Sequence, residues 1–180
     1  MERIEKQQLD LNGKNILVTG AAGFIGSYLA RRLLKETTAA TIIGIDCLTD
    51  YNPIELKKWR LQQIDAAAKD SASAWKFIQG DIADKELIDS LFAEYKFAVV
   101  VNLAAQAGVR YSIEHPETYI HSNLIGFYNL LEAARHDEAI EHFVYASSSS
   151  VYGGNKKIPF STDDKVDNPV SLHAATKKIQ

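Results

Sequence analysis

The 180-residue sequence predicts an α/β fold with a doubly wound parallel sheet. Short runs rich in Val, Ile and Leu alternate along the chain with longer amphipathic stretches. Several of these runs are apolar at nearly every position, as expected for parallel strands that helices cover on both faces. Strands and helices that alternate with short connections form right-handed crossovers, and these build a parallel sheet.

The apolar runs and the stretches between them give the expected elements. The strands are expected at Asn15–Thr19, Thr41–Asp46, Trp75–Gln79, Phe97–Leu103 and His142–Ser147. The helices are expected at Gly23–Glu36, Ile54–Lys69, Lys85–Tyr95 and Pro116–His136, with Asp84 as the N-cap of the third. In the first helix an apolar stripe is expected to face the sheet, formed by Phe24, Ile25, Tyr28, Leu29 and Leu33.

Composition and charge argue against several classes of protein. The 20 basic and 23 acidic residues give a net charge of −3, which argues against nonspecific nucleic-acid binding. The single cysteine, Cys47, excludes an intramolecular disulfide and a cysteine-rich zinc site. Because the histidines show no ligand spacing, we expect no metal. The chain has no apolar run of about 18 residues and no secretory signal, so we expect no membrane span and a cytoplasmic location.

The length of the chain predicts one globular domain, since a domain usually has about 100–200 residues. We expect a helical or irregular leader over residues 1–12 and a single folded domain over residues 13–180.

A glycine motif follows the first expected strand. It reads TGAAGFIG over residues 19–26 and lies between a strand and a helix, the context that makes such a motif informative. Gly20 permits a tight turn, and Gly23 lets backbone N–H groups approach a pyrophosphate at the positive end of the helix. Gly26 lets the helix and the strand pack closely. The alternative is a tight strand–helix turn that binds nothing.

Aspartates lie at the ends of the second and third strands. Asp46 lies 20 positions after Gly26, where a carboxylate accepts hydrogen bonds from the adenosine ribose and repels a 2′-phosphate. No arginine directly follows it, so NAD is preferred over NADP. Asp81 could meet the adenine amino group, with Ile82 against the ring. For each aspartate the alternative is an ordinary loop or turn residue.

Small and polar residues follow the fourth and fifth strands. The segment NLAAQAG over residues 102–108 would let a flat cofactor lie against the backbone, although its alanines could serve packing alone. The serines at 147–150 could hydrogen-bond a substrate oxygen or form an ordinary turn. His173 and Lys177 are four residues apart and share a face if that segment is helical, and a solvated helix face is the alternative. Arg110 could reach a substrate phosphate or carboxylate, or form a surface salt bridge.

The motifs GAAGFIG, IDCL, GDIAD, NLAAQAGVRYS, ASSSSVYG and AATKK occur in that order over nearly the whole chain. The identity and order of these motifs resemble those of the NAD-dependent epimerase/dehydratase family of extended short-chain dehydrogenases/reductases. The string LAAQAGVRYS is similar to the UDP-glucuronate 4-epimerase branch in particular. The resemblance implies a Rossmann domain with NAD as cofactor, a nucleotide sugar of the UDP-hexuronate type as substrate, and a homodimer through the helix at 116–136.

The resemblance also implies roles for single positions. The implied cofactor-binding residues are Gly20, Gly23, Phe24, Ile25 and Gly26 for the pyrophosphate, Asp46 for the ribose, Asp81 and Ile82 for the adenine, and Leu103, Ala104, Ala105 and Lys177 for the nicotinamide side. The implied catalytic residues are Ser148, His173 and Lys177.

Two departures from the family pattern bear on activity. His173 stands at the position of the family's catalytic tyrosine. Histidine, with a pKa near 6.5, needs no lowering to accept a proton, but it is shorter than tyrosine and a base must lie within about 3 Å of the proton it takes. The chain also ends at Gln180, so we expect an N-terminal piece that lacks most of the C-terminal substrate domain.

Two functional hypotheses remain. The first is a UDP-glucuronate 4-epimerase-like enzyme that acts by transient C4 oxidation and hydride return, with severely reduced or absent turnover in this chain. The second is a non-catalytic NAD-binding module derived from the same family. A 4,6-dehydratase is less favoured, because that branch resembles Thr-Asp-Glu before Val-Tyr-Gly where this chain has serines at 148–150.

Overall fold

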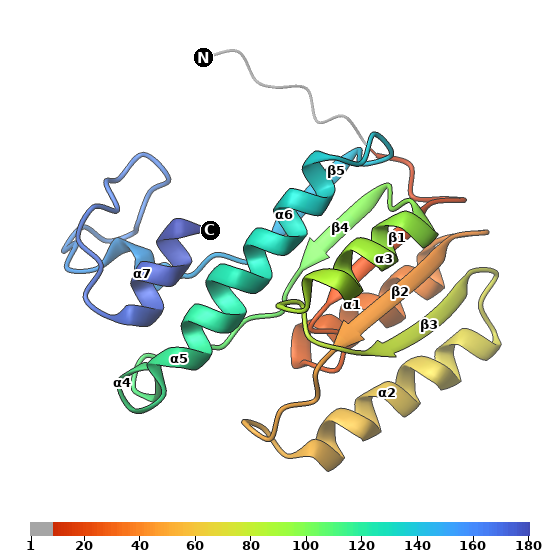
Figure 1. Ribbon diagram of the computed structural model, residues 1–180, viewed down its shortest axis with the longest axis horizontal. Helices are drawn as coiled ribbons and strands as arrows, with labels where there is room; N and C mark the ends of the chain where they lie inside the picture. Colours follow the sequence, from red (N-terminus) through yellow and green to blue (C-terminus); the bar gives the residue numbers. More distant parts are fainter. Residues whose placement is uncertain (1–8) are drawn as a thin grey trace.

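A five-stranded parallel sheet with helices on both faces forms the centre of the protein in the computed structural model, which describes residues 9–180 (Figure 1). The strands lie in the order β3-β2-β1-β4-β5. Their bounds are Asn15–Thr19 for β1, Thr41–Asp46 for β2, Ala74–Gln79 for β3, Val99–Asn102 for β4 and His142–Tyr145 for β5. This topology confirms the predicted doubly wound parallel sheet.

The strand register places the carboxyl ends of the strands along one edge of the sheet. Thr19, at the end of β1, lies opposite Ile45 and Asn102, and Asp46 lies opposite Gln79. The chain builds outward from β1 through β2 and β3, and then returns to the other side of β1 to form β4 and β5. The edge between β1 and β4 is therefore the topological switch point, where ligands bind in sheets of this kind.

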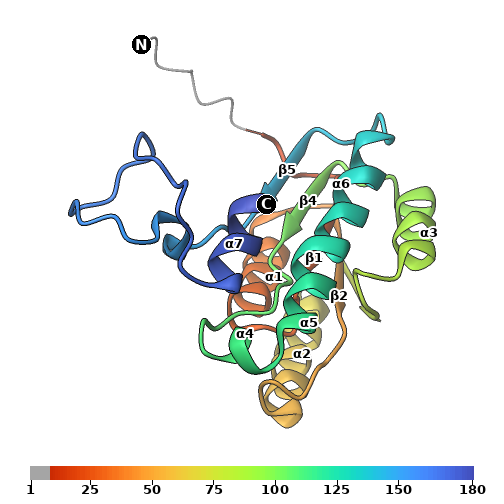
Figure 2. The same ribbon diagram turned by 60° about the vertical axis from the view of Figure 1, so that its left-hand side comes forward.

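Helices cover the two faces of the sheet in pairs. α1 (Phe24–Glu36) and α2 (Ile54–Lys69) pack on one face, and α3 (Lys85–Tyr95) and α6 (Phe127–Arg135) pack on the other (Figure 2). Fully buried strand residues alternate between the two layers, with Ile16, Val18 and Ile42 on the α1 side and Leu17, Ile43 and Ile45 on the α3 side. The alternation is the period-2 pattern of strands buried on both faces.

Short elements follow β4 and β5. They are α4 (Tyr111–Glu114), α5 (Pro116–Tyr119), the π-helical segment η1 (Ile120–Gly126), the 3-10 turn η2 (Ser149–Tyr152) and α7 (Leu172–Ile179). In both views α7 lies beside the long helix formed by α5, η1 and α6, and it packs against η1, α5 and η2 (Figures 1 and 2). Within residues 9–180, no helix has the length and apolarity needed to cross a bilayer.

The described part of the chain begins inside the expected leader. Residues 1–8 of that leader lie outside the described residues. Leu9 and Leu11, near its end, pack against the core on the α1 side of the sheet.

The face that α1 presents to the sheet differs from the prediction. Phe24, Ile25 and Tyr28 are 66%, 63% and 60% exposed, whereas Gly26 and Ala30 are buried. The expected stripe was therefore wrong for the three large residues. The physical reason is distance: the first turns of α1 lie so close to the end of β1 that only small side chains fit there between the helix and the sheet, whereas Leu33 and Leu34 are buried further along the helix.

The helix expected over residues 116–136 forms, but its middle is π-helical. The segment η1 separates α5 from α6 without a break in the chain's helical path. Asn123 in this segment is fully buried, and its side-chain amide bonds both the backbone N–H and the carbonyl of Gln106, at 2.8 and 3.0 Å. π-Helical turns are rare and often occur at functional sites, and the apolar spacing of the sequence does not reveal them.

Asp84 caps α3 as predicted, and the cap gives a testable stability effect. Its carboxylate accepts a hydrogen bond from the N–H of Leu87 at 3.1 Å. Asp84→Ala is expected to lower the free energy of unfolding by about 1 kcal/mol, because this N–H loses its partner. Urea denaturation measures the change. Asp70→Ala, at an exposed position with no side-chain hydrogen bond among residues 9–180, should change it by less than about 0.5 kcal/mol, and equal effects of the two substitutions would contradict the capping role.

Candidate functional site

A cavity of about 140 Å³ lies at the carboxyl edge of the sheet, where β1, β2, β3 and β4 end. Its lining gathers predicted cofactor-binding residues from four separate strand ends: Gly20, Gly23, Asp46, Asp81, Ile82, Leu103, Ala104 and Ala105. The strand register brings these segments together although they are spread over much of the chain.

A second cavity, of about 560 Å³, adjoins the first. The two share the lining residues Cys47, Thr49, Asp81, Gln106 and Ser122. The second cavity extends along α5 and η1, away from the glycine turn. The shared lining residues join the two cavities into one elongated path from the β1–α1 turn past Asp81 to η1.

The β1–α1 turn depends on its glycines. Gly20 has φ +67°, a left-handed conformation that disfavours side chains, and its carbonyl accepts the N–H of Gly23 at 2.9 Å. A Cβ at Gly26 would overlap the carbonyl oxygen of Gly20 and lie 2.9 Å from its carbon. Gly23 begins α1 without a side-chain cap, and no acidic residue occupies the first turn. The first N–H groups of α1 are thus available to an anion.

Asp46 fixes the adjacent end of β2 and is itself buried. Its carboxylate accepts hydrogen bonds from the N–H of Ala22 at 3.2 Å and from the N–H of Leu48 at 2.8 Å. The ammonium of Lys57, also buried, lies 3.6 Å from the same carboxylate and 3.3 Å from the hydroxyl of Thr49. The two backbone donors and the Lys57 ammonium therefore hold the Asp46 carboxylate in a defined orientation next to the glycine turn.

Thr19 positions the loop that follows β4. Its hydroxyl donates to the side-chain oxygen of Asn102 at 2.5 Å and accepts the N–H groups of Leu103 and Ala104 at 3.1 and 3.0 Å. Thr19 is fully buried, so these bonds are shielded from water. They hold the backbone of residues 103–105 against the end of β1, and Gly20 leaves room for it: a Cβ there would lie 2.9 Å from the nitrogen of Ala104.

The three predicted catalytic residues lie around α7, and none is among the described residues that line the two cavities. The hydroxyl of Ser148 accepts from the N–H and the hydroxyl of Ser150, at 3.2 and 2.8 Å. The ammonium of Lys177 donates to the carbonyl of Ala146 at 3.0 Å and to the side chain of Gln180 at 2.7 Å. Within residues 9–180, no hydrogen bond joins Ser148, Lys177 and His173 to one another.

His173 and Lys177 are both only 7% exposed, and burial changes how they titrate. Burial, together with repulsion from the Lys177 ammonium, lowers the pKa of His173. Its ring packs edge-to-face on Tyr119, with 5.9 Å between centroids, and its Nδ1 is buried without a hydrogen-bond partner among the described residues. Burial lowers the pKa of Lys177 to about 8. His173 is therefore neutral at pH 7, and Lys177 remains mostly charged.

The pKa of Lys177 predicts a specific pH dependence of stability. Between its folded pKa of about 8 and the ordinary value of 10.5, the unfolded chain binds more protons than the folded one, so stability rises with pH. Below pH 8 the group is protonated in both states, and the cost of burying its charge is fully present. Relative to Lys177→Met, the wild type should therefore gain about 2 kcal/mol between pH 7 and pH 10.

Urea denaturation of the two proteins at pH 7 and pH 10 measures this gain. Lys178→Met, at the exposed neighbouring position, serves as the matched control and should show no such gain. A stability difference between wild type and Lys177→Met that is the same at both pH values would contradict the lowered pKa.

Besides the three predicted catalytic residues, four predicted site residues lie outside the lining of both cavities: Phe24, Ile25, Gly26 and Arg110. The side chains of Phe24 and Ile25 are exposed, so only their backbone N–H groups, at the uncapped start of α1, could serve an anion. Arg110, at the start of α4, is exposed and lies outside the lining of both cavities.

Sequence reasoning missed several residues that build the site. Lys57 and Thr19 support the strand ends, and Asn123 joins the loop at Gln106 to Thr176 of α7 by a bond of 3.1 Å. His121 contacts Asp81. Lys57 lies on an amphipathic helix, where a lysine usually faces water, so no local signal marked it. Within residues 9–180, no group of three or more His, Cys, Asp or Glu side chains could hold a metal ion.

A glycine turn that opens a helix, an aspartate at the end of the neighbouring strand and small residues after β4 define a dinucleotide-binding Rossmann domain. The family model described as GDP-mannose 4,6 dehydratase matches residues 17–180. The chain belongs to this family of epimerases and dehydratases, as the sequence motifs predicted.

Individual relatives agree with this assignment. Protein CapI from Staphylococcus aureus is 50% identical over 163 residues, which cover 91% of this chain and 46% of that protein. UDP-glucuronate 4-epimerase 4 from Arabidopsis thaliana is 46% identical over 167 residues, which cover 93% of this chain and 36% of that protein. The chain thus spans about half the length, or less, of these curated relatives.

A solved structure is similar over the same region. The UDP-glucose-4-epimerase from Stenotrophomonas maltophila, with bound NAD and formylated UDP-arabinopyranose, matches with a TM-score of 0.76 and 27% identity. The match covers 92% of this chain and 46% of that one.

Proposed function

We propose that this chain binds NAD along the carboxyl edge of the sheet and provides the cofactor-binding half of a nucleotide-sugar 4-epimerase of the UDP-glucuronate type. The observation that carries the proposal is the pairing of the uncapped start of α1, above the Gly20–Gly23 turn, with the Asp46 carboxylate in one cavity. A pyrophosphate and a neighbouring ribose diol need this combination of donors and acceptor. The NAD-bound epimerase and the UDP-glucuronate 4-epimerase named above support both parts of the proposal.

The residues of the elongated path fit an extended NAD molecule. The backbone N–H groups of Phe24, Ile25 and Gly26 would hold the pyrophosphate. The N–H of Gly23 instead closes the turn on the carbonyl of Gly20, and Cβ atoms at Gly23 and Gly26 would collide with the backbone of the turn. The Asp46 carboxylate would accept the adenosine ribose hydroxyls. The remaining assignments within the path are Asp81 and Ile82 to the adenine, and Leu103, Ala104 and Ala105 to the nicotinamide side. Lys177, which lies outside the lining of both cavities, is assigned to the nicotinamide ribose from the family resemblance.

The acid–base part of the reaction would fall to His173, Ser148 and Lys177. Bound NAD would supply the reversible oxidation at the sugar C4. His173 is neutral at pH 7, and its buried Nδ1 has no hydrogen-bond partner among residues 9–180, so it could accept the proton of a hydroxyl that reaches it. Imidazole is shorter than the phenol of the family's catalytic tyrosine, and a misplacement of 1 Å can cost about a hundredfold in rate. We therefore expect weak turnover, with Arg110 as a candidate contact for the sugar's acidic groups.

A second candidate function is a non-catalytic NAD-binding module. One observation favours it: Ser148, His173 and Lys177 lie outside the lining of the cavities, whereas Asp46, Asp81, Ile82 and residues 103–105 lie inside. In this case NAD would serve as a structural or sensing ligand.

We also propose a homodimer through the helix formed by α5, η1 and α6. Its inward residues Tyr119, Phe127 and Leu130 are buried in the chain's own core. Its outer side exposes other apolar residues, namely Ile120, Ile125, Tyr128 and Leu131, of which Ile120 and Ile125 also line the second cavity. An exposed apolar stripe on a helix is typical of a partner surface. Sedimentation of the purified chain would test this pairing.

Calorimetric titration with NAD and with UDP-glucuronate, followed by an assay for UDP-galacturonate, tests the proposed function. Binding of both ligands with slow formation of product supports the epimerase. Binding of NAD alone supports the module. Absence of NAD binding would overturn both proposals.

A further inference from the structure

We propose that His121 is a positioning residue that holds the Asp81 carboxylate toward the exocyclic amino group of the adenine, and so makes the site select adenine over hypoxanthine. The inference rests on the proposed NAD site and adds to it a residue that determines base specificity.

The geometry fixes both oxygens of the Asp81 carboxylate. One oxygen accepts the N–H of Ala83 at 2.9 Å, and the other lies 3.0 Å from Nε2 of His121. The first bond lies within the turn after β3, whereas the second comes from η1, 40 residues further along the chain. A carboxylate bonded at both oxygens keeps one orientation and still has free lone pairs for a ligand donor.

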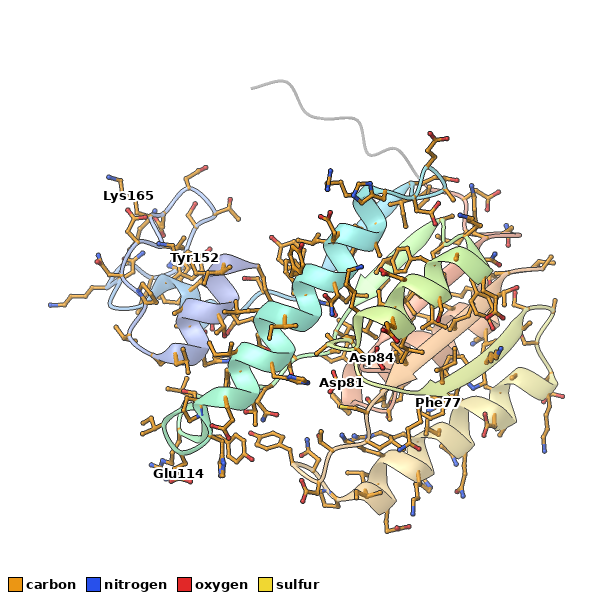
Figure 3. All side chains as sticks on the ribbon, viewed as in Figure 1. Phe77, Asp81, Asp84, Glu114, Tyr152 and Lys165 are labelled. Atoms are coloured by element: carbon orange, nitrogen blue, oxygen red, sulfur yellow. The ribbon has the colours of Figure 1, made fainter. Side chains whose placement is uncertain are left out.

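The same helix holds the backbone of that turn. The side-chain amide of Asn129 donates to the carbonyls of Ile82 and Ala83, at 3.1 and 3.0 Å, and Asn129 is buried. Gly126 permits the close approach, since a Cβ there would lie 2.5 Å from the side chain of Ile82. Two residues of the continuous helix η1–α6 therefore hold the turn: Asn129 bonds its backbone, and His121 bonds the Asp81 side chain. Figure 3 shows the labelled Asp81 next to this helix.

The π-helical backbone of η1 explains how His121 reaches Asp81. In an α-helix three successive side chains point in directions about 100° apart and cannot share one side. The wider turn of η1 brings successive side chains closer in direction. His121 reaches Asp81, Ser122 lines both cavities, and Asn123 bonds Gln106.

The chemistry of the two bases makes the contact selective. The adenine amino group donates hydrogen bonds, and a fixed carboxylate oxygen accepts one. Hypoxanthine has a carbonyl oxygen at that position, so two acceptors would face each other. Without His121, Asp81 could rotate toward solvent, because 39% of its side chain is exposed. Both the favourable contact with adenine and the repulsion of hypoxanthine would then weaken.

Calorimetric titration of the purified chain with NAD and with nicotinamide hypoxanthine dinucleotide tests the inference. The measured quantity is the ratio of the two dissociation constants. His121→Ala should reduce the preference for NAD about tenfold, as expected for loss of a hydrogen bond that orients a charged acceptor. His121→Gln keeps an N–H donor and should retain the preference within about threefold. His136 is an exposed histidine just after α6 that pairs with Glu132. His136→Ala should leave the ratio of the two dissociation constants unchanged.

Each outcome decides between the proposals. A wild-type chain that binds NAD, with the same ratio in His121→Ala, overturns the role of His121 and leaves the proposed function intact. Equal losses in His121→Gln and His121→Ala would also overturn it, because retention of the donor would then have no effect. A wild-type chain that does not bind NAD overturns the proposed function and this inference together.

Discussion

Gly26→Ala is expected to destabilise the protein by about 3 kcal/mol and to abolish measurable NAD binding. In an ordinary helix interior the same change would stabilise by about 1 kcal/mol, because alanine is the better helix former. At Gly26 a steric collision makes the change in stability unfavourable. The new Cβ would overlap the carbonyl oxygen of Gly20 and lie 3.0 Å from the Cα of Ala21. Both are backbone atoms, so α1 must move away from β1, and the anion-binding turn moves with it.

Urea denaturation and calorimetric titration with NAD measure the two effects. Gly154→Ala is the matched control, because a Cβ at Gly154 would meet no atom of residues 9–180 within 4 Å. It should leave NAD binding unchanged. If Gly26→Ala bound NAD like the wild type and unfolded at the same urea concentration, close packing of α1 on the turn could not be the basis of the site.

Asp46→Asn is expected to weaken NAD binding by about ten- to a hundredfold, the loss typical of hydrogen bonds to a charged group. The substitution keeps the shape of the side chain but removes the charge that accepts ribose hydroxyls. It also leaves Lys57, now 3.6 Å from a neutral group, with an unpaired positive charge at the ribose position. A 2′-phosphate would be attracted where the wild type repels it, so the preference for NAD over NADP should fall.

Parallel titrations with NAD and NADP measure both changes. Asp50→Asn alters an exposed aspartate on the same loop that is outside the lining of both cavities, and should change neither affinity. An unaltered NAD affinity in Asp46→Asn would show that the carboxylate does not hold the ribose.

The sequence predicted the sheet well, because its strands are marked by local composition. β1 at Asn15–Thr19 and β2 at Thr41–Asp46 have the expected bounds, and so do α2 and α3. Both strands are buried on both faces, and a run of β-branched residues signals such burial directly. The burial of α1 was predicted less well. A hydrophobic pattern identifies large apolar residues but not the distance between a helix and the sheet, and here a short distance selects Gly26 and Ala30.

Part of the site could also be predicted from local sequence patterns. The glycine turn and Asp46 follow strand ends at recognisable spacings, and the structure gathers them in one cavity. The contacts that hold these site residues in place could not be predicted. Thr19 bonds Asn102 across 83 residues, and His121 reaches Asp81 across 40, and no local spacing encodes either pair. The π-helical turn that orients His121 also has no signature in the apolar periodicity of its segment.

The central claim is that the pyrophosphate of NAD rests on the backbone N–H groups where α1 begins. A crystal structure of the chain grown with excess NAD tests it most directly. We expect the phosphate oxygens within hydrogen-bond distance of the N–H groups of residues 24–26, and the ribose hydroxyls on Asp46. A structure with the dinucleotide bound elsewhere, or with this turn empty at saturating NAD, would contradict the account.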